Sequence, residues 1–327
     1  MLDLARKKLP APGDNHSEDC VLLIISKIKK TQLTCNDVQC HIAVSAAGNT
    51  VANILRNIME TNATGLAVFG SSQVLVEENH ISRNQTAGVS IGGFAKGEFK
   101  NNTISENEGP NVKLSASAAP LLFNNVITAG HSQGLVFCGS SKGTALKNKI
   151  ELNAMMQVLI EHEASPILQN NFICHGKSAG ILITDRSLAF VGQNDVCANE
   201  GSAIILAEHA NPTVVGNSCQ ENGRCGLEIR QQARGVVLRN AFVRSMAVSI
   251  LVSGEATPLI QTNLIQYGLH DGVLFSGTSR PVFSDNRILN CQLIGLHVRD
   301  DARPVQAHAH AHCTRKRKRK YKTIRKI

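Results

Sequence analysis

A repeat of 23 residues, without insertions or deletions, is the feature that most constrains how this chain of 327 residues can fold. The unit that begins at Gly134 opens with a short alternating apolar run, Leu135 and Phe137, and the same pattern returns at Gly88 and Gly272. The eleven units begin at residues 65, 88, 111, 134, 157, 180, 203, 226, 249, 272 and 295. A fixed period of this length predicts a solenoid, in which each unit buries its apolar face against its neighbours.

Four positions of the unit carry the pattern. The first is Gly in seven units, and the next and third-next positions are aliphatic or Phe throughout. The position seven after the start holds only small residues: Ser72, Ala95, Ala118, Ser141, Ala164, Ser187, Ala210, Ala233, Ala256, Ser279 and Ala302. The position fourteen after the start is Asn in ten units: Asn79, Asn102, Asn125, Asn148, Asn171, Asn194, Asn217, Asn240, Asn263 and Asn286.

Two architectures compete for this period. A leucine-rich repeat would need apolar residues eight, five and three positions before the Asn, but the position eight before is mostly polar and the position five before is Pro in six units. The pattern is better explained by three short strands in each unit. One strand follows the Gly, a corner lies at the small residue, and the other two strands lie before and after the Asn. They predict an all-β fold, a parallel β-helix of about eleven or twelve coils, which the preference of parallel crossovers makes right-handed.

This fold divides the chain into three parts. The β-helix is expected to span residues 42–305, after an irregular N-terminal segment with a possible first coil (1–41) and before a His-containing, basic tail (306–327) that we expect to be disordered. The Asn column is expected to occupy one turn, because Asn tolerates a left-handed backbone. Its side chains are expected to hydrogen-bond amide to amide between coils.

Composition suggests where such a chain works. Residues 1–19 do not resemble a signal peptide, so we expect a cytoplasmic or nuclear protein. The ten cysteines are then expected to be reduced. Cys174 and Cys197 share one column in adjacent coils, and we expect packed thiols there.

The repeat also resembles a known group. The segments GVSIGGFAKGEFKNNTISENEG (88–109) and GVLFSGTSRPVFSDNRIL (272–289) resemble the pectin-lyase-like β-helix repeats of carbohydrate-acting proteins and, more closely, the β-helix bodies of F-box-only proteins. The latter resemblance implies the substrate-recognition part of a ubiquitin ligase, with protein partners such as a ligase adaptor and client proteins. No F-box is recognisable in residues 1–41.

We expect no catalytic residues, metal or cofactor. Uniform coils leave little room for the long loops of sugar-cleaving enzymes, aromatic residues make up only 4% of the chain, and the acidic residues form no paired column. One group of charged residues is expected to stack after the first strand of successive coils, as a solvated ridge of compensating charges or, alternatively, as an interaction surface. This polar ridge comprises Glu161, His162, Glu163, Asp185, Arg186, Glu208, His209 and Arg230.

The net charge of +9 resides in the tail, because residues 314–327 hold nine Lys or Arg and no acid. The run Arg315, Lys316, Arg317, Lys318, Arg319 and Lys320 is typical of a nuclear-import signal, and it predicts at most weak nucleic-acid binding. The preceding HAHAHC (308–313) has metal-ligand spacing, but we interpret it as a polar run. No segment predicts membrane binding.

Two functions follow from these observations. The favoured one is a non-catalytic interaction scaffold of the F-box type. The alternative is a polysaccharide-acting lyase or hydrolase, or a carbohydrate-binding β-helix.

Overall fold

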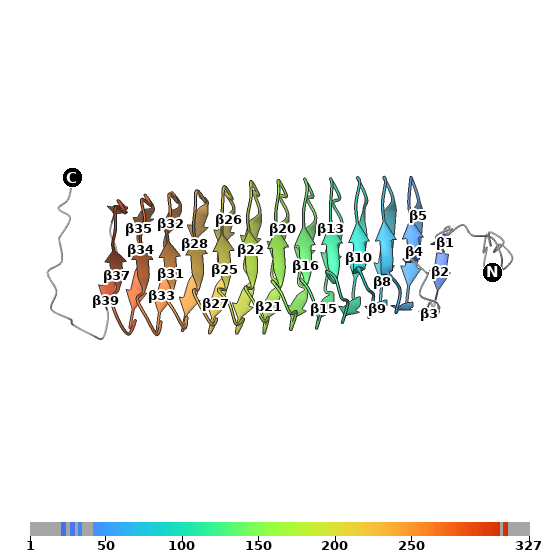
Figure 1. Ribbon diagram of the computed structural model, residues 1–327, viewed down its shortest axis with the longest axis horizontal. Coiled ribbons are helices and arrows are strands. Elements are labelled where there is room, and N and C mark those ends of the chain that lie inside the picture. The colour runs from blue at the N-terminus through green and yellow to red at the C-terminus, as the bar shows by residue number, and fades with distance from the viewer. Residues whose placement is uncertain (1–20, 24–26, 30–31, 35–41, 308–309, 313–327) are drawn as a thin grey trace.

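The computed structural model describes residues 21–23, 27–29, 32–34, 42–307 and 310–312. It confirms the predicted parallel β-helix, which forms a straight rod with one coil stacked on the next (Figure 1). All regular secondary structure in these residues is strand, and they contain no helix long and apolar enough to cross a membrane.

Three parallel sheets run along the rod, each with thirteen strands among the described residues. Sheet A contains β1 (Val21–Leu23), β4 (Ile42–Ala46), β7 (Thr64–Val68), β10 (Ala87–Ile91), β13 (Val112–Leu114), β16 (Leu135–Phe137), β19 (Val158–Ile160), β22 (Ile181–Ile183), β25 (Ile204–Leu206), β28 (Leu227–Ile229), β31 (Ile250–Val252), β34 (Val273–Phe275) and β37 (Leu296–Val298). Sheet B contains β2 (Lys27–Lys29), β5 (Val51–Leu55), β8 (Gln73–Glu77), β11 (Lys96–Lys100), β14 (Leu121–Phe123), β17 (Thr144–Leu146), β20 (Ile167–Gln169), β23 (Phe190–Gly192), β26 (Thr213–Val215), β29 (Val236–Leu238), β32 (Leu259–Gln261), β35 (Val282–Ser284) and β38 (Val305–Ala307). Sheet C contains β3 (Gln32–Thr34), β6 (Ile58–Glu60), β9 (His80–Ser82), β12 (Thr103–Ser105), β15 (Val126–Thr128), β18 (Lys149–Glu151), β21 (Phe172–Cys174), β24 (Asp195–Cys197), β27 (Ser218–Gln220), β30 (Ala241–Val243), β33 (Leu264–Gln266), β36 (Arg287–Leu289) and β39 (His310–His312).

The strand register follows the 23-residue period. Val158 pairs with Ile181, and the corresponding residues pair at each later step of sheet A. One upstream coil is shorter, since Ile42 pairs with Thr64. This 22-residue step explains why the repeat loses its regularity before residue 65.

Glycine begins most coils because the next coil approaches its backbone. A Cβ atom on Gly134 would lie 2.7 Å from the carbonyl oxygen of Gln157, and one on Gly180 would lie 2.7 Å from that of Ala203. Either contact would require the backbone to move. The small residues seven positions later are fully buried from Ser72 to Ser279, where a larger side chain would meet the coils above and below.

The Asn column forms a continuous hydrogen-bonded ladder inside the rod. The backbone N–H and the side-chain amide of Asn171 both donate to Oδ1 of Asn194 at 2.9 Å, and the same amide donates to the carbonyl of Ala145 at 2.9 Å. Each Asn therefore joins three coils. The left-handed residue of this turn is not the ladder Asn but the residue before it, such as Asn170 with φ 53°.

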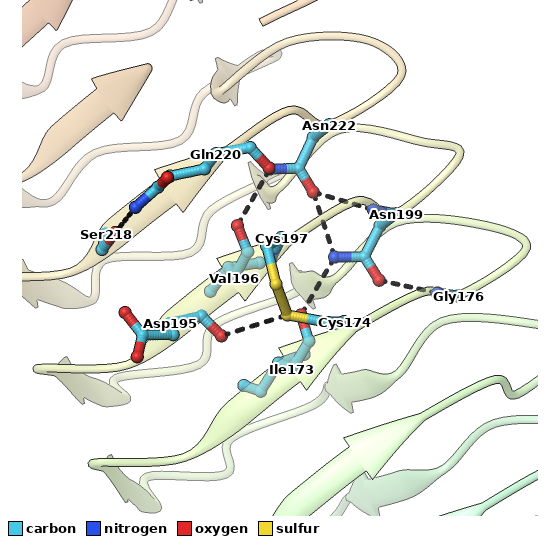
Figure 2. Close-up of a disulfide and its surroundings, with 10 residues drawn as sticks. All are labelled: Ile173, Cys174, Gly176, Asp195, Val196, Cys197, Asn199, Ser218, Gln220 and Asn222. Atoms are coloured by element: carbon cyan, nitrogen blue, oxygen red, sulfur yellow. Dashed lines mark hydrogen bonds between the residues drawn. A yellow bond between two sulfur atoms is a disulfide. The ribbon is translucent and has the colours of Figure 1, made fainter. Parts of the chain in front are cut away.

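A second, interrupted Asn column lies in the turn between sheets C and A. The backbone N–H and side-chain amide of Asn199 donate to Oδ1 of Asn222 at 3.1 and 3.0 Å (Figure 2). The repeat analysis missed this column because other residues replace Asn in five coils: Gly130, Gly176, Ser245, Gly268 and Cys291.

Cys174 and Cys197 form a disulfide between β21 and β24 (Figure 2). The prediction of packed thiols is therefore wrong. The register pairs the two residues directly, with Cα atoms 4.6 Å apart, which is within the range that a disulfide spans. The expectation rested on the assumed compartment rather than on this geometry.

We expect Asn171→Leu to lower the free energy of unfolding by about 1–3 kcal/mol, because it leaves buried donors and acceptors on neighbouring coils without partners. Asn170→Gly is the matched control, since Asn170 is exposed and glycine tolerates its left-handed backbone. Denaturant unfolding measures both. Equal stability of the two variants would contradict a stabilising ladder.

Replacing both Cys174 and Cys197 with Ala should destabilise the protein by about 3 kcal/mol, the value typical of a disulfide that closes a loop of this size. Thermal unfolding, compared with the wild type under reducing and oxidising conditions, measures the loss. Reduction should lower the midpoint of the wild type and leave that of the variant unchanged. Peptide mapping of thiol-blocked protein that finds both residues alkylated would disprove the disulfide.

Candidate functional site on the outer face of sheet A

The polar ridge lies in the turns that follow β19, β22, β25 and β28. Four successive turns, those after β16, β19, β22 and β25, enclose an open depression of about 480 Å³. Six of the eight predicted residues line it, together with Gly139 and Ser140: His162, Glu163, Asp185, Arg186, Glu208 and His209. Glu161 directly precedes His162, and Arg230 follows β28 in the next coil.

Hydrogen bonds between coils fix the centre of the ridge. The backbone N–H of His162 donates to Oδ2 of Asp185 at 2.6 Å and holds the pKa of Asp185 below its usual value. One coil further, the backbone N–H of Glu208 donates to Oε1 of Gln231 at 2.9 Å. The side chains of Asp185 and Gln231 are therefore each held by the backbone of the preceding coil.

Glu161, His162 and Asp185 also form a group of ligand type. Their donor atoms lie within 4.8 Å of one another, with Nδ1 of His162 3.7 Å from Oε1 of Glu161. Nitrogen and carboxylate oxygen donors suit Cu(II) and Zn(II). The nearby thiol of Cys138 is a poorer ligand, because burial raises its pKa.

The outer face of sheet A borders the ridge and is mostly apolar. The middle residue of each strand points outward there, and in the central coils it is Val136, Leu159, Leu182, Ile205, Glu228, Leu251 and Leu274. Glu228 interrupts this outer row although its side chain is only 11% exposed. Its Oε2 accepts a hydrogen bond from the hydroxyl of Ser202 at 3.1 Å, and its Oε1 lies 3.5 Å from Nη1 of Arg230.

The fold does not require an acid in this row, since neighbouring coils place Leu and Ile there. Sequence analysis named Arg230 but missed Ser202 and Glu228. The sequence did carry a signal for Glu228, because this acid is the one break in an otherwise aliphatic column of the central coils.

The other predicted elements lie elsewhere. The Asn ladder is buried inside the rod and contributes no side chain to the depression. The basic run Arg315–Lys320 lies outside the described residues, and so do parts of HAHAHC (308–313).

Two family models match the sequence. The model described as right handed beta helix region matches residues 113–265 and 179–314, together more than half of the chain. The chain belongs to the right-handed β-helix family. The model described as periplasmic copper-binding protein (NosD) matches residues 15–181. No curated protein matches the sequence.

Solved structures show the same fold at low sequence identity. The periplasmic alginate epimerase AlgG is similar with a TM-score of 0.63 and 10% identity, over 81% of this β-helix protein and 77% of the epimerase. A mutant of AlgG is similar with a TM-score of 0.60 and 10% identity, over 94% and 82% of the two chains. The A-module of the Azotobacter vinelandii mannuronan C-5 epimerase AlgE4 reaches 0.40 at 11% identity, over 90% and 91%.

These findings correct two expectations. The matched families and structures are right-handed β-helix proteins, among them periplasmic and polysaccharide-modifying ones, so the interpretation as the substrate-recognition body of an F-box ubiquitin ligase is wrong. The expected cytoplasmic or nuclear location is wrong too, because NosD and AlgG are both described as periplasmic. The error arose because the repeat pattern encodes the coil, which many unrelated functions share.

Proposed function

We propose that this β-helix protein binds and acts on a polysaccharide outside the cytoplasm. The observation that carries the proposal is the convergence of six predicted ridge residues on one depression beside the outer face of sheet A. Carboxylates and imidazoles can bind sugar hydroxyls, and the two arginines can pair with acidic groups.

The repeat itself favours a linear polymer as the ligand. Successive coils present equivalent side chains at the strand spacing of about 4.8 Å, which is of the same order as the length of one sugar unit. An apolar row flanked by polar side chains also matches the mixed surface of a sugar chain. The Cys174–Cys197 disulfide supports an oxidising compartment, where such bonds persist.

The similarity of the fold to alginate epimerases makes acidic polysaccharides the first probes. Alginate, pectate and a neutral β-glucan should be tested with purified protein by titration calorimetry. We expect one of them to bind, and we expect Asp185→Asn with Glu208→Gln to weaken that binding by about ten- to a hundredfold, the cost of losing hydrogen bonds to charged groups.

Asp195→Asn is the matched control, because Asp195 is an exposed carboxylate on sheet C, away from the ridge. Its affinity should match that of the wild type. Equal weakening by the control, or no binding of any probe, would contradict the proposal.

Copper binding is a second candidate function, favoured by the group of Glu161, His162 and Asp185. The NosD match covers the first two of these residues. A bound Cu(II) would supply Lewis-acid or redox chemistry, and the three side chains would hold it through one nitrogen and carboxylate oxygens.

Titration with Cu²⁺, followed by electron paramagnetic resonance, should find one site with nitrogen and oxygen donors that His162→Gln removes. His175→Gln is the control, since His175 lies on another turn. Replacing His308, His310 and His312 with Gln excludes binding by the HAHAHC run. If His162→Gln leaves the signal unchanged, the ridge is not the copper site.

A further inference from the structure

A buried carboxylate lies on the outer face of sheet A, near the C-terminal end of the rod. Asp271 directly precedes Gly272, the first residue of the coil that contains β34, and its side chain is only 6% exposed. The equivalent residues of the two preceding coils are Cys225 and Val248. The coil therefore does not need an acid at this position.

Both oxygens of Asp271 are engaged by the next coil. Oδ1 accepts the backbone N–H of Ile294 at 3.0 Å, and Oδ2 lies 2.9 Å from Nδ1 of His297. Because a carboxylate can only accept, the proton of the imidazole resides on Nδ1, and Nε2 is left with a free lone pair.

His297 stands in the outer row of sheet A, where the preceding coils have Leu251 and Leu274. Its side chain is 37% exposed, so part of the ring is open to solvent. The two residues thus depart from apolar columns in adjacent coils and meet each other. This is the arrangement by which a carboxylate orients a histidine for proton transfer.

We propose that His297 and Asp271 form a proton-transfer pair for a polysaccharide lying along sheet A, an inference that rests on the proposed function. Nε2 takes a proton from a C–H group of the sugar, and the electron pair of that bond stays on the carbon. The new N–H bond makes an imidazolium, which the carboxylate of Asp271 stabilises. The proton is then returned to the same carbon, which breaks no other bond. Alternatively, the electron pair on the carbon forms a double bond and expels the neighbouring glycosidic oxygen, which takes the proton.

One neighbouring cation can pair with an acidic sugar, and it also faces an exposed acid: Nε of Arg299 lies 3.8 Å from Oδ2 of Asp300. Arg299 follows His297 by two residues, so it lies about 7 Å further along the strand direction. Its side chain is 57% exposed. A cation there can neutralise a sugar carboxylate, which makes the C–H bond beside that carboxylate more acidic.

Apolar side chains lie beside the pair on the outer face of sheet A. Cys225, Val248 and Leu274 form a buried cluster with Ala247 and Leu251 on the same outer face. An open depression of about 310 Å³ lies in the preceding turns between sheets C and A, and Glu221, Arg244, Met246, Tyr267 and Leu269 line it. A sugar chain held in this region would present its units to His297.

The first test is spectroscopic and needs no substrate. Nitrogen NMR of histidine-labelled protein should show His297 protonated at Nδ1, and Asp271→Val should move the proton toward Nε2. Valine is chosen because Val248 occupies the equivalent position one coil earlier. A wild-type His297 without a proton on Nδ1 would overturn the pair.

The second test follows the reaction. Alginate and pectate are incubated with the protein in deuterated water, and deuterium in the sugar, new reducing ends and unsaturated products are measured. His297→Leu, chosen because Leu274 occupies this position in the preceding coil, should lower the rate by about 10²–10⁴-fold while probe binding is retained. Asp271→Val should also lower the rate.

His270→Gln is the matched control, because Nδ1 of His270 lies 4.0 Å from Oδ1 of Asp271 and makes no hydrogen bond to it. Its rate should match that of the wild type. Binding of a probe without deuterium incorporation or product, or full activity of His297→Leu, would overturn the proton-transfer pair and leave the proposed function standing. Failure of all probes to bind would overturn both.

Discussion

Hydrogen bonds from the interior Asn side chains to neighbouring coils are the interaction on which the rest of the structure depends. Each ladder Asn connects its own backbone turn to the coils on both sides, so the same residue must return at the same place in every coil. The 22-residue step from Ile42 to Thr64 respects this requirement. Asn57 still bonds to Asn79, and the missing residue falls in the next turn, between Asn62 and Thr64. The number of residues in a coil can therefore change in a turn that contains no ladder Asn.

This constraint explains which parts of the molecule could be predicted from the sequence. Interior positions repeat because identical coils pack on one another, and their columns therefore predicted the strands, the corners and the fold. The outer face is not bound by the repeat. Its residues vary from coil to coil, so the period carries no information about what the protein does. The resemblance to F-box proteins reflected the residues that any such coil needs in its interior and turns. The function inferred from it was wrong.

The ridge was predictable because Glu161, Asp185 and Glu208 are polar residues at neighbouring turn positions, which stacking brings together. The pair of Asp271 and His297 was not, because the two residues occupy different columns and meet only across a coil boundary. The cysteines were placed correctly in one column, but their chemical state was decided from compartment. Strand pairing at 4.6 Å was the stronger physical argument.

The same geometry governs how such a rod can work on a ligand. Within the described residues, the coils from residue 65 onward have constant length and form no lid that could close. The stacked sheets cannot hinge without breaking the ladder. Any site there must therefore be preorganised in the open structure, by side chains whose partners lie on the next coil. Three contacts between coils follow this rule: Asp185 with His162, Ser202 with Glu228, and Asp271 with His297. All three contacts lie on sheet A or in the turns at its two edges. A long polymer can contact all of them, whereas a small molecule can reach only one.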